Sequence, residues 1–323
     1  MRVHIIQPTH YMAAGGGGER RLARTRRLNL MPLTLPYLAA LVPDGVEVVL
    51  TDERTGELDA TAACDLVFIS VWTINSLRAY EIAREYRARG VPVVMGGPHT
   101  FFYTDEVSAH ADAVAIGEGE YTIPEIIEDF SRGGRGGLKG LYRAERLHDL
   151  VGLPLPRREL LDRSAFTRFH TVAVQTSRGC PNVCEFCTER FYLGTKYRMR
   201  PVPEVIEEIR ATGSRRIFFA DSTLAGKRSR TMELMEALIP LGVRWSALWT
   251  ADRVLDRPFM ELAKRSGLLH VNIGVESVKQ ATLDGMNKRT TKADRLAEMV
   301  ATLRDLDISF SFNLIFGWDS DTL

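Results

Sequence analysis

The sequence has no long apolar run and few cysteines. No apolar stretch in its 323 residues reaches the roughly 20 residues that a membrane-spanning helix needs. The start, Met1 to Pro8, is too short in its apolar part to be a secretory signal, and its pattern favours a first strand. Only four cysteines occur, which excludes a disulfide-rich secreted scaffold. We therefore expect a cytoplasmic protein without a membrane span.

An excess of one sign of charge is also missing. Lys and Arg number 42 and Asp and Glu number 41, so the composition does not predict a nucleic-acid-binding protein. A local exception is the arginine-rich stretch 20–27, which follows the glycines at 15–18 and is interpreted as a solvated loop. With 45% hydrophobic and 26% charged residues, the composition is typical of globular proteins, and the length predicts two domains.

Strand and helix patterns alternate along most of the chain, which predicts an α/β fold. Residues 1–131 predict a Rossmann-like, flavodoxin-like domain with a parallel sheet. The segment 132–170 begins with a Gly-rich stretch and is interpreted as a linker. Residues 171–323 contain five strand patterns with helices between them, as in a partial (β/α) barrel. The fifth strand would be a bare edge, and proteins normally cover such an edge. We therefore expect this barrel to be truncated after its fifth strand, or its edge to be covered by a further segment or a partner.

Three cysteines lie close together after the first strand of the second domain. Cys180, Cys184 and Cys187 have a C-x3-C-x2-C spacing. Three thiolates can hold three irons of a [4Fe–4S] cluster, and the fourth iron then stays open to the amino and carboxylate groups of S-adenosylmethionine. The alternative is a structural zinc site. Zinc generally needs four protein ligands, and no second pair of Cys or His is close by, so the spacing favours the cluster.

This motif, with Phe186 just before its last cysteine, resembles the radical S-adenosylmethionine superfamily. The resemblance implies reductive cleavage of the cofactor to a 5′-deoxyadenosyl radical, with electrons from a flavodoxin or ferredoxin type of donor. It also implies cofactor contacts at the ends of the later strands. These are the amino group at Asp221, the carboxylate at Arg253, the ribose at Glu276 and the adenine at Asn313. For a single charged residue of this kind, a structural ion pair is the alternative.

The first domain resembles the cobalamin-binding domain that precedes the radical domain in one subclass of this superfamily. The residues that carry the resemblance are predicted to line the corrin: Trp72, Thr73, Gly96, Gly97, Gly117 and Gly119. No Asp-x-His-x-x-Gly stretch supplies a histidine to cobalt, and the nearest candidate is His99. One interpretation is that Trp72 excludes water and a further ligand from the lower face; the alternative is that Trp72 packs under the loop as part of the ordinary core. Cys64 alone cannot hold the second cluster of the related methylthiotransferases.

Together these features predict a cobalamin-dependent radical enzyme. The leading hypothesis is a methyltransferase that acts on a weakly activated carbon of a small-molecule or natural-product substrate. One alternative is a cyclase or a ring-rearranging oxidoreductase that uses the same cofactors without methyl transfer. Another is a corrinoid-binding or redox-sensing protein without catalysis.

Overall fold

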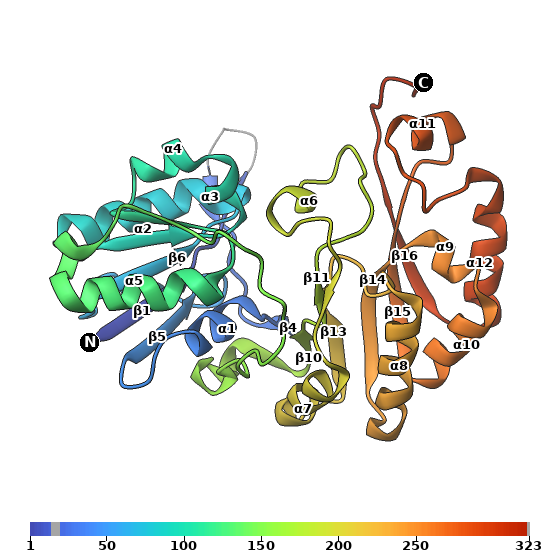
Figure 1. Ribbon diagram of the computed structural model, residues 1–323, viewed down its shortest axis with the longest axis horizontal. Coiled ribbons are helices and arrows are strands. Elements are labelled where there is room, and N and C mark those ends of the chain that lie inside the picture. The colour runs from blue at the N-terminus through green and yellow to red at the C-terminus, as the bar shows by residue number, and fades with distance from the viewer. Residues whose placement is uncertain (14–19, 322–323) are drawn as a thin grey trace. The chain divides into compact units, whose positions relative to one another are not determined.

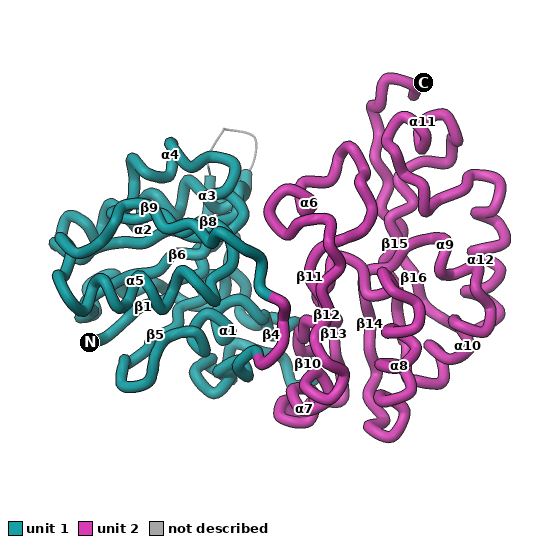
Figure 2. Tube along the Cα trace, viewed as in Figure 1, with its two compact units in different colours: residues 1–148, 153–170 teal, residues 149–152, 171–323 magenta. Residues whose placement is uncertain are grey.

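The computed structural model describes residues 1–13 and 20–321 and divides into two compact units (Figures 1 and 2). Unit 1 comprises residues 1–148 and 153–170, and unit 2 comprises residues 149–152 and 171–323. Each unit is built on a parallel sheet with helices packed against it, so the predicted α/β class is confirmed. The glycine run at 15–18 lies outside the described residues.

Unit 1 has a six-stranded sheet in the order β5-β1-β6-β7-β8-β9, and its neighbouring strands are parallel. The first five follow the flavodoxin-like order 2-1-3-4-5. Chain order reverses between β1 and β6, and such a switch point is where ligands bind beyond the carboxyl ends of the strands. The strands are β1 Arg2–Gln7, β5 Glu47–Asp52, β6 Leu66–Ser70, β7 Val93–Gly96, β8 Ala113–Ile116 and β9 Leu141–Arg143.

Helices cover both faces of this sheet. β6 is buried along its whole length, as expected for an apolar strand covered on both sides. Val67 and Ile69 pack with α2 residues such as Ile82 and Tyr86 in one hydrophobic core. The helical elements are α1 Thr34–Ala40, η2 Thr73–Asn75, α2 Ser76–Ala88, α3 Pro98–Phe102, α4 Thr104–Ser108, α5 Gly119–Gly133, η3 Gly134–Gly137, η4 Arg158–Leu160 and η5 Arg163–Ala165.

Two segments differ from what the sequence suggested. Part of the arginine-rich stretch forms β3 (Arg20–Leu22), which pairs antiparallel with β2 (Tyr11–Ala13), and β4 spans Leu28–Met31. The stretch is therefore not a simple loop. The segment 132–170, expected as a linker, contributes the sixth strand β9, which adds to β8.

The curled sheet of unit 2 has the order β4-β10-β13-β14-β15-β16, and its strands from β10 to β16 are parallel (Figure 1). The predicted partial barrel is confirmed. Its strands are β10 Phe166–Val174, which begins in unit 1, β13 Arg216–Phe219, β14 Arg244–Trp249, β15 Leu268–Glu276 and β16 Ser309–Leu314. Two short strands, β11 Ser177–Arg178 and β12 Arg198–Met199, pair antiparallel after β10. Parallel strands end at the same edge of a sheet, so the loops that follow them meet there.

The helices of unit 2 lie between these strands and bury their apolar faces. In α10, for example, Phe259, Met260, Leu262 and Ala263 are buried, which is the i, i+3, i+4 spacing of one helix face. The helical elements are α6 Glu189–Tyr192, α7 Val202–Thr212, α8 Arg228–Leu238, η6 Ile239–Leu241, α9 Ala251–Val254, α10 Arg257–Arg265, α11 Gln280–Gly285, η7 Ala293–Arg295 and α12 Leu296–Asp305.

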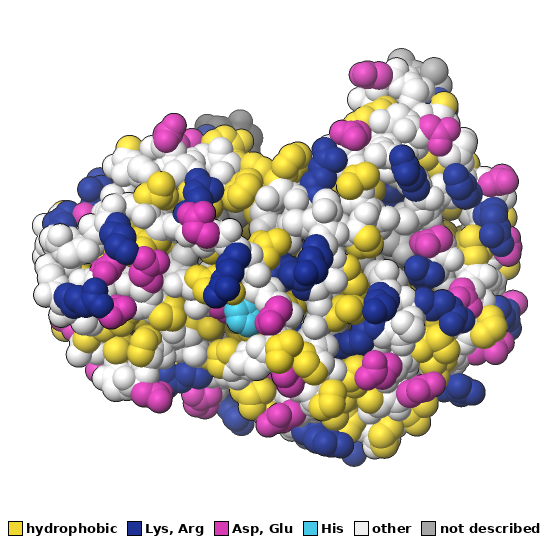
Figure 3. Space-filling model, viewed as in Figure 1, with side chains coloured by type: hydrophobic (Ala, Val, Ile, Leu, Met, Phe, Trp, Pro, Cys, Tyr) yellow, Lys and Arg dark blue, Asp and Glu magenta, His cyan; other side chains and the backbone are white. Residues whose placement is uncertain are grey.

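The surface carries charges of both signs. On the face shown in Figure 3, Lys and Arg side chains are interspersed with Asp and Glu side chains over each unit, as expected from the near-zero net charge. Among the described residues, no helix combines the length and the apolar character that crossing a bilayer requires.

Candidate active site

The three cysteines of the motif lie on one loop of unit 2, between β11 and β12. The antiparallel pairs Ser177–Met199 and Arg178–Arg198 close the base of this loop. Gly179 turns the chain into the motif with φ +82°, and a Cβ at that position would collide with the Lys196 carbonyl oxygen. Glycine is required there because the backbones approach closely in a left-handed conformation. Gly179 therefore fixes the direction in which the cysteine loop leaves the β11–β12 pair.

The thiols suit a cluster better than a single metal ion. Cys184 is buried, Cys180 and Cys187 are half-buried, and all three are free. Burial raises the pKa of the Cys180 and Cys184 thiols, while Lys288 acts to lower the pKa of Cys184. No three Cys, His, Asp or Glu side chains in residues 1–13 and 20–321 gather around one point as a single metal ion needs. Zinc needs such a point, whereas a [4Fe–4S] cluster binds each thiolate through a different iron.

Asp221, directly after β13, lies at the base of the cysteine loop. Its Oδ1 accepts hydrogen bonds from the backbone N–H groups of Thr176 (2.7 Å) and Ser177 (3.2 Å). Its Oδ2 accepts from the hydroxyl groups of the same residues at 2.6 and 2.9 Å. Burial raises the pKa of this carboxyl group, and the four hydrogen bonds act in the opposite direction. We infer that Asp221 positions the loop, because both of its oxygens are already engaged; its predicted contact with the cofactor stays a prediction.

Replacing Asp221 by alanine should therefore weaken the loop rather than only the cofactor contact. The change leaves two buried N–H groups unpaired, at about 1–3 kcal/mol for each. We expect Asp221→Ala to lower the stability of unit 2 and the iron content after reconstitution, as measured by calorimetry and iron analysis. Asp256→Ala, at the half-buried N-cap of α10, is the control and should retain its iron. Full iron loading in Asp221→Ala would contradict the positioning role.

Glu276 ends β15 in an unusual conformation. It has φ +68°, and the register with β16 shifts between Gly274 and Glu276, so a bulge redirects the side chain. The carboxylate is buried and pairs with the Lys288 ammonium, with 3.1 Å between Oε1 and Nζ. A Cβ at Gly274 would stand 2.9 Å from the same ammonium. A strained backbone at a residue that also forms a buried ion pair is typical of functional sites.

Lys288 is the residue that the sequence analysis missed. Its ammonium lies 5.8 Å from the centre of the Phe186 ring, so it is close to both the cysteine motif and Glu276. The two residues just before it are bound to the motif: the N–H of Glu185 donates to the Met286 carbonyl oxygen (3.0 Å), and the Asn287 side-chain amide donates to the Val183 carbonyl oxygen (3.2 Å). No local pattern in the sequence distinguishes this lysine from a solvated one.

The predicted ribose contact of Glu276 can be tested by binding. A hydrogen bond to a charged group contributes about 1.5–3 kcal/mol, so Glu276→Gln should weaken S-adenosylmethionine binding roughly tenfold to a hundredfold. Iron content should not change, since the thiolates are untouched. Glu261→Gln removes an exposed ion pair with Arg257 on α10 and is the matched control. An unchanged dissociation constant for Glu276→Gln, measured by equilibrium dialysis, would leave only a structural ion pair.

The other two residues predicted to contact S-adenosylmethionine are Arg253 and Asn313. Arg253 lies in α9, and its Nε donates to the Ala225 carbonyl oxygen at 3.1 Å, which joins the loop after β13 to the end of β14. Asn313 lies in β16, where it is exposed and opposite Gly274 of β15. Both residues are thus near the carboxyl ends of the strands, and their roles stay predictions.

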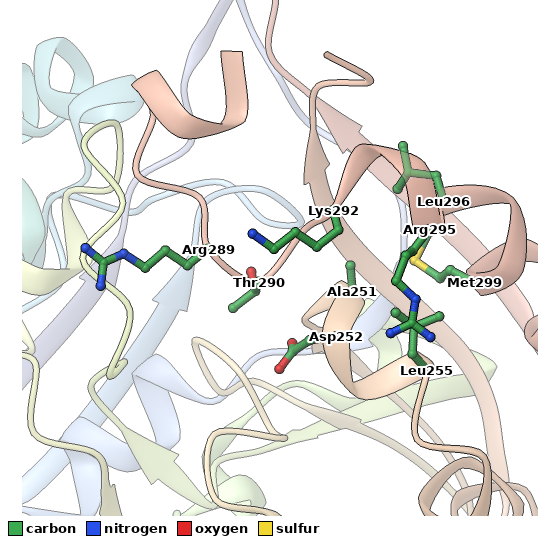
Figure 4. Close-up of a pocket in the computed structure, with 9 residues that line it drawn as sticks. All are labelled: Ala251, Asp252, Leu255, Arg289, Thr290, Lys292, Arg295, Leu296 and Met299. Atoms are coloured by element: carbon green, nitrogen blue, oxygen red, sulfur yellow. The ribbon is translucent and has the colours of Figure 1, made fainter. Parts of the chain in front are cut away.

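A small cavity of about 160 Å³ lies beside α9 and α12 in unit 2. Figure 4 shows the residues that line it, with Arg289 extending away from the others. Sites for drug-sized ligands have volumes of roughly 300–1,000 Å³. This cavity is therefore too small for a polycyclic substrate. It is lined by Ala251, Asp252, Leu255, Arg289, Thr290, Lys292, Arg295, Leu296 and Met299.

In unit 1, the predicted corrin residues surround a cavity of about 170 Å³ at the carboxyl ends of β6, β7 and β8. Trp72, Gly96, Gly97, Gly117 and Gly119 all line it, whereas Thr73 lies next to it in the same loop. The remaining lining residues are mostly apolar: Thr34, Leu38, Phe68, Ile69, Ser70, Pro98, Ala115, Thr122 and Ile123. A slot of this volume can hold only a part of cobalamin, and its apolar lining and glycine walls suit close contact with that part.

The glycines of this slot are needed for close backbone packing. Gly97 has φ +110°, and a Cβ there would lie 2.7 Å from the Val71 carbonyl oxygen. At Gly117, with φ +93°, a Cβ would lie 2.9 Å from the Ala144 methyl group. The loops after β6 and β7 are therefore held side by side, and the N–H of His99 also donates to the Val71 carbonyl oxygen (3.1 Å).

His99 is not free to coordinate cobalt. Its Nδ1 is hydrogen-bonded to the Thr73 hydroxyl (3.1 Å) and its Nε2 to the Tyr80 hydroxyl (2.9 Å). Trp72, by contrast, is 46% exposed beside the slot. We expect bound cobalt(II) corrinoid to show a base-off spectrum without nitrogen coupling from the protein in electron paramagnetic resonance. A nitrogen splitting that disappears in His99→Ala would contradict this.

Comparisons with known proteins agree with this geometry. Residues 174–322 match the Radical SAM superfamily, and residues 20–127 match the B12 binding domain. The bacteriochlorophyllide d C-12(1)-methyltransferase of Chlorobaculum tepidum is 32% identical over 302 residues, which is 90% of this chain and 66% of that protein. The anaerobic magnesium-protoporphyrin IX monomethyl ester cyclase of Rubrivivax gelatinosus is 27% identical over 365 residues, covering 100% of this chain and 63% of that protein.

A solved structure shows the same fold. The radical S-adenosylmethionine methyltransferase TsrM from Kitasatospora setae, with cobalamin and a [4Fe–4S] cluster bound, matches with a TM-score of 0.77 at 19% identity, covering 99% of this chain and 70% of that chain. The chain spans about two thirds of the length of the curated relatives described above. It belongs to the cobalamin-dependent radical S-adenosylmethionine enzymes, whose cofactors are a [4Fe–4S] cluster, S-adenosylmethionine and cobalamin.

Proposed function

We propose that the protein is a methyltransferase that adds a methyl group to a weakly activated carbon of a polycyclic small molecule. The observation that carries the proposal is that one chain holds both the thiolate loop and the corrin slot. The relative with 32% identity, named as a methyltransferase of bacteriochlorophyllide d, supports it. When bound, the cofactors supply a 5′-deoxyadenosyl radical for hydrogen abstraction and a methyl group held on cobalt.

The chain's own residues would hold these groups in place. Cys180, Cys184 and Cys187 would bind the cluster, and Asp221 would hold the base of their loop. The Glu276–Lys288 pair would orient the nucleoside end of S-adenosylmethionine. In unit 1, the glycine-walled slot would fix the corrin, and Trp72 would keep water from its lower face by bulk, since an indole N–H is a donor only and cannot act as a ligand.

A cyclase is the second candidate, and a specific observation favours it. The relative from Rubrivivax gelatinosus, named as a cyclase, aligns with 100% of this chain. Cofactor residues do not separate the two reactions. Named relatives of both kinds are enzymes, which leaves no support for a purely sensing role.

The proposed reaction is tested with the full-length protein, reconstituted without oxygen with iron, sulfide and cobalamin. A tetrapyrrole such as a chlorophyllide and a cell extract are each incubated with S-adenosylmethionine carrying a labelled methyl group. We expect the label in a carbon-bound methyl group of a product, detected by mass spectrometry. Substrate consumption with ring closure and no label would establish the cyclase instead.

The redox state of the cysteines also bears on the cellular location of the protein and on its electron donor. The described cysteines are all free, which is compatible with a reducing compartment. We therefore propose a cytoplasmic enzyme that receives electrons from a flavodoxin or ferredoxin type of donor. Reduction of the reconstituted cluster by a purified flavodoxin system, followed by optical spectroscopy, tests this step.

A further inference from the structure

A chain of hydrogen bonds in unit 1 joins the surface to the loop beside the corrin slot. The Tyr80 hydroxyl donates to Glu106 Oε1 at 2.8 Å. The same hydroxyl lies 2.9 Å from His99 Nε2, and His99 Nδ1 lies 3.1 Å from the Thr73 hydroxyl oxygen. His99 is 3% exposed and Tyr80 9%, whereas the Glu106 side chain is 51% exposed. The two inner members are thus shielded from water, and the chain ends at Thr73 on the exposed loop that follows Trp72.

The direction of every proton in this chain follows from chemistry. An ionised carboxylate can only accept hydrogen bonds, so the Tyr80 hydroxyl donates its one proton to Glu106. The tyrosine oxygen must then accept from His99, which places a proton on Nε2. Burial lowers the pKa of His99, and a neutral ring with a proton on Nε2 has a bare Nδ1. That nitrogen accepts the Thr73 proton, so the Thr73 oxygen has only lone pairs left for a ligand.

We propose that Thr73 is a fixed hydrogen-bond acceptor that selects corrinoids whose side chains are amides over corrinoids whose side chains are carboxylates. Cobalamin carries primary amides around its ring, and an amide N–H can donate to the Thr73 oxygen. A carboxylate has no proton to donate, so its oxygen atoms would be repelled by the lone pairs of the Thr73 oxygen. Tyr80 and His99 act through Thr73 as positioning residues. The proposal rests on the corrin site described above and not on methyl transfer.

The opposite state of His99 would reverse this preference. A protonated ring donates from both nitrogens, so Nδ1 would donate to Thr73 and free the hydroxyl proton to point outward. The same reversal would follow from a proton on Nδ1 alone. Nitrogen-15 NMR of histidine-labelled full-length protein without corrinoid separates these states. We expect a neutral His99 with its proton on Nε2, assigned by loss of the signals in His99→Phe. A proton on Nδ1 would overturn the proposal.

Binding supplies the second test, with two corrinoids that both lack the nucleotide tail: cobinamide, whose side chains are amides, and cobyrinic acid, whose side chains are carboxylates. We expect Thr73→Val to weaken cobinamide binding roughly five- to tenfold, the effect of one neutral hydrogen bond. Cobyrinic acid binding should be unchanged or stronger. Thr73→Ser, which retains the hydroxyl group, should bind like the wild type. An equal change for both corrinoids would overturn the proposal.

A matched pair of tyrosine variants tests the relay. Tyr80→Phe removes the group that fixes the His99 tautomer, so the preference for cobinamide should fall. Tyr86→Phe removes the hydroxyl 3.0 Å from Nδ1 of another buried histidine, His4, which is also hydrogen-bonded to a threonine, Thr51. We expect Tyr86→Phe to retain the preference; equal loss in both variants would show a general packing effect and overturn the relay. A protein that shows the preference but transfers no methyl group would refute the proposed function alone.

Discussion

Cys184→Ala should abolish both the cluster and the cleavage of S-adenosylmethionine. The wild-type protein, reconstituted without oxygen, should bind about four irons and release 5′-deoxyadenosine when reduced. Cys184 is buried and lies at the centre of the motif, so its loss leaves two thiolates for the cluster. Two thiolates hold a cubane poorly, and we expect product formation to fall below detection. Iron and sulfide analysis and chromatography of the nucleoside measure the two effects.

The control is the fourth cysteine of the chain. Cys64 is half-buried in unit 1, so Cys64→Ala removes a thiol without touching the loop. It should retain iron, sulfide and nucleoside release. Metal analysis also separates the zinc alternative, because a zinc site would bind one zinc and give no nucleoside. Full iron content and cleavage in Cys184→Ala would refute the assignment of the motif.

Much of the fold follows from periodicity that the sequence displays. β6 is an uninterrupted apolar run, and its burial on both faces is what such a run predicts for a parallel sheet. The three residues of β9 have no such signal: only Tyr142 is buried, and the strand follows a Gly-rich stretch. It forms because β8 offers an open edge, which is a tertiary cause that local propensity does not contain.

The candidate active site also has features that the sequence reveals and features that only the fold reveals. The cysteine spacing is local, so the sequence reveals it, and Asp221 and Glu276 were found because they follow strand ends. The contacts of these residues are long-range. Lys288 lies 12 positions after Glu276 in a polar loop, and only the fold shows that it is buried against that carboxylate. Likewise, the role of His99 depends on Tyr80, which is contributed by a different helix.

Gly97→Ala should destabilise unit 1 and eliminate tight cobalamin binding. Gly97 has φ +110° and ψ 179°, a region that only glycine commonly adopts, and strain there costs about 1–3 kcal/mol. The new Cβ would also lie 2.7 Å from the Val71 carbonyl oxygen and 3.0 Å from its nitrogen. Forcing an extra carbon into a packed region lowers the free energy of unfolding by about a further 1–3 kcal/mol. We therefore expect a loss of roughly 3–5 kcal/mol, a large part of the stability of one domain.

Gly45→Ala separates strain from collision. Gly45 also has a positive φ, +85°, but a Cβ there meets nothing within 4 Å. It should cost only about 1–2 kcal/mol, the price of the left-handed conformation, and leave cobalamin binding intact. Hydrogen exchange of the β6 and β7 amides, followed by mass spectrometry, reports the stability of unit 1 without interference from unit 2. Gly97→Ala should speed this exchange far more than Gly45→Ala does. Equal exchange rates in the two variants would mean that the loops after β6 and β7 separate easily, and the slot would then not be the rigid corrin site inferred from its glycines.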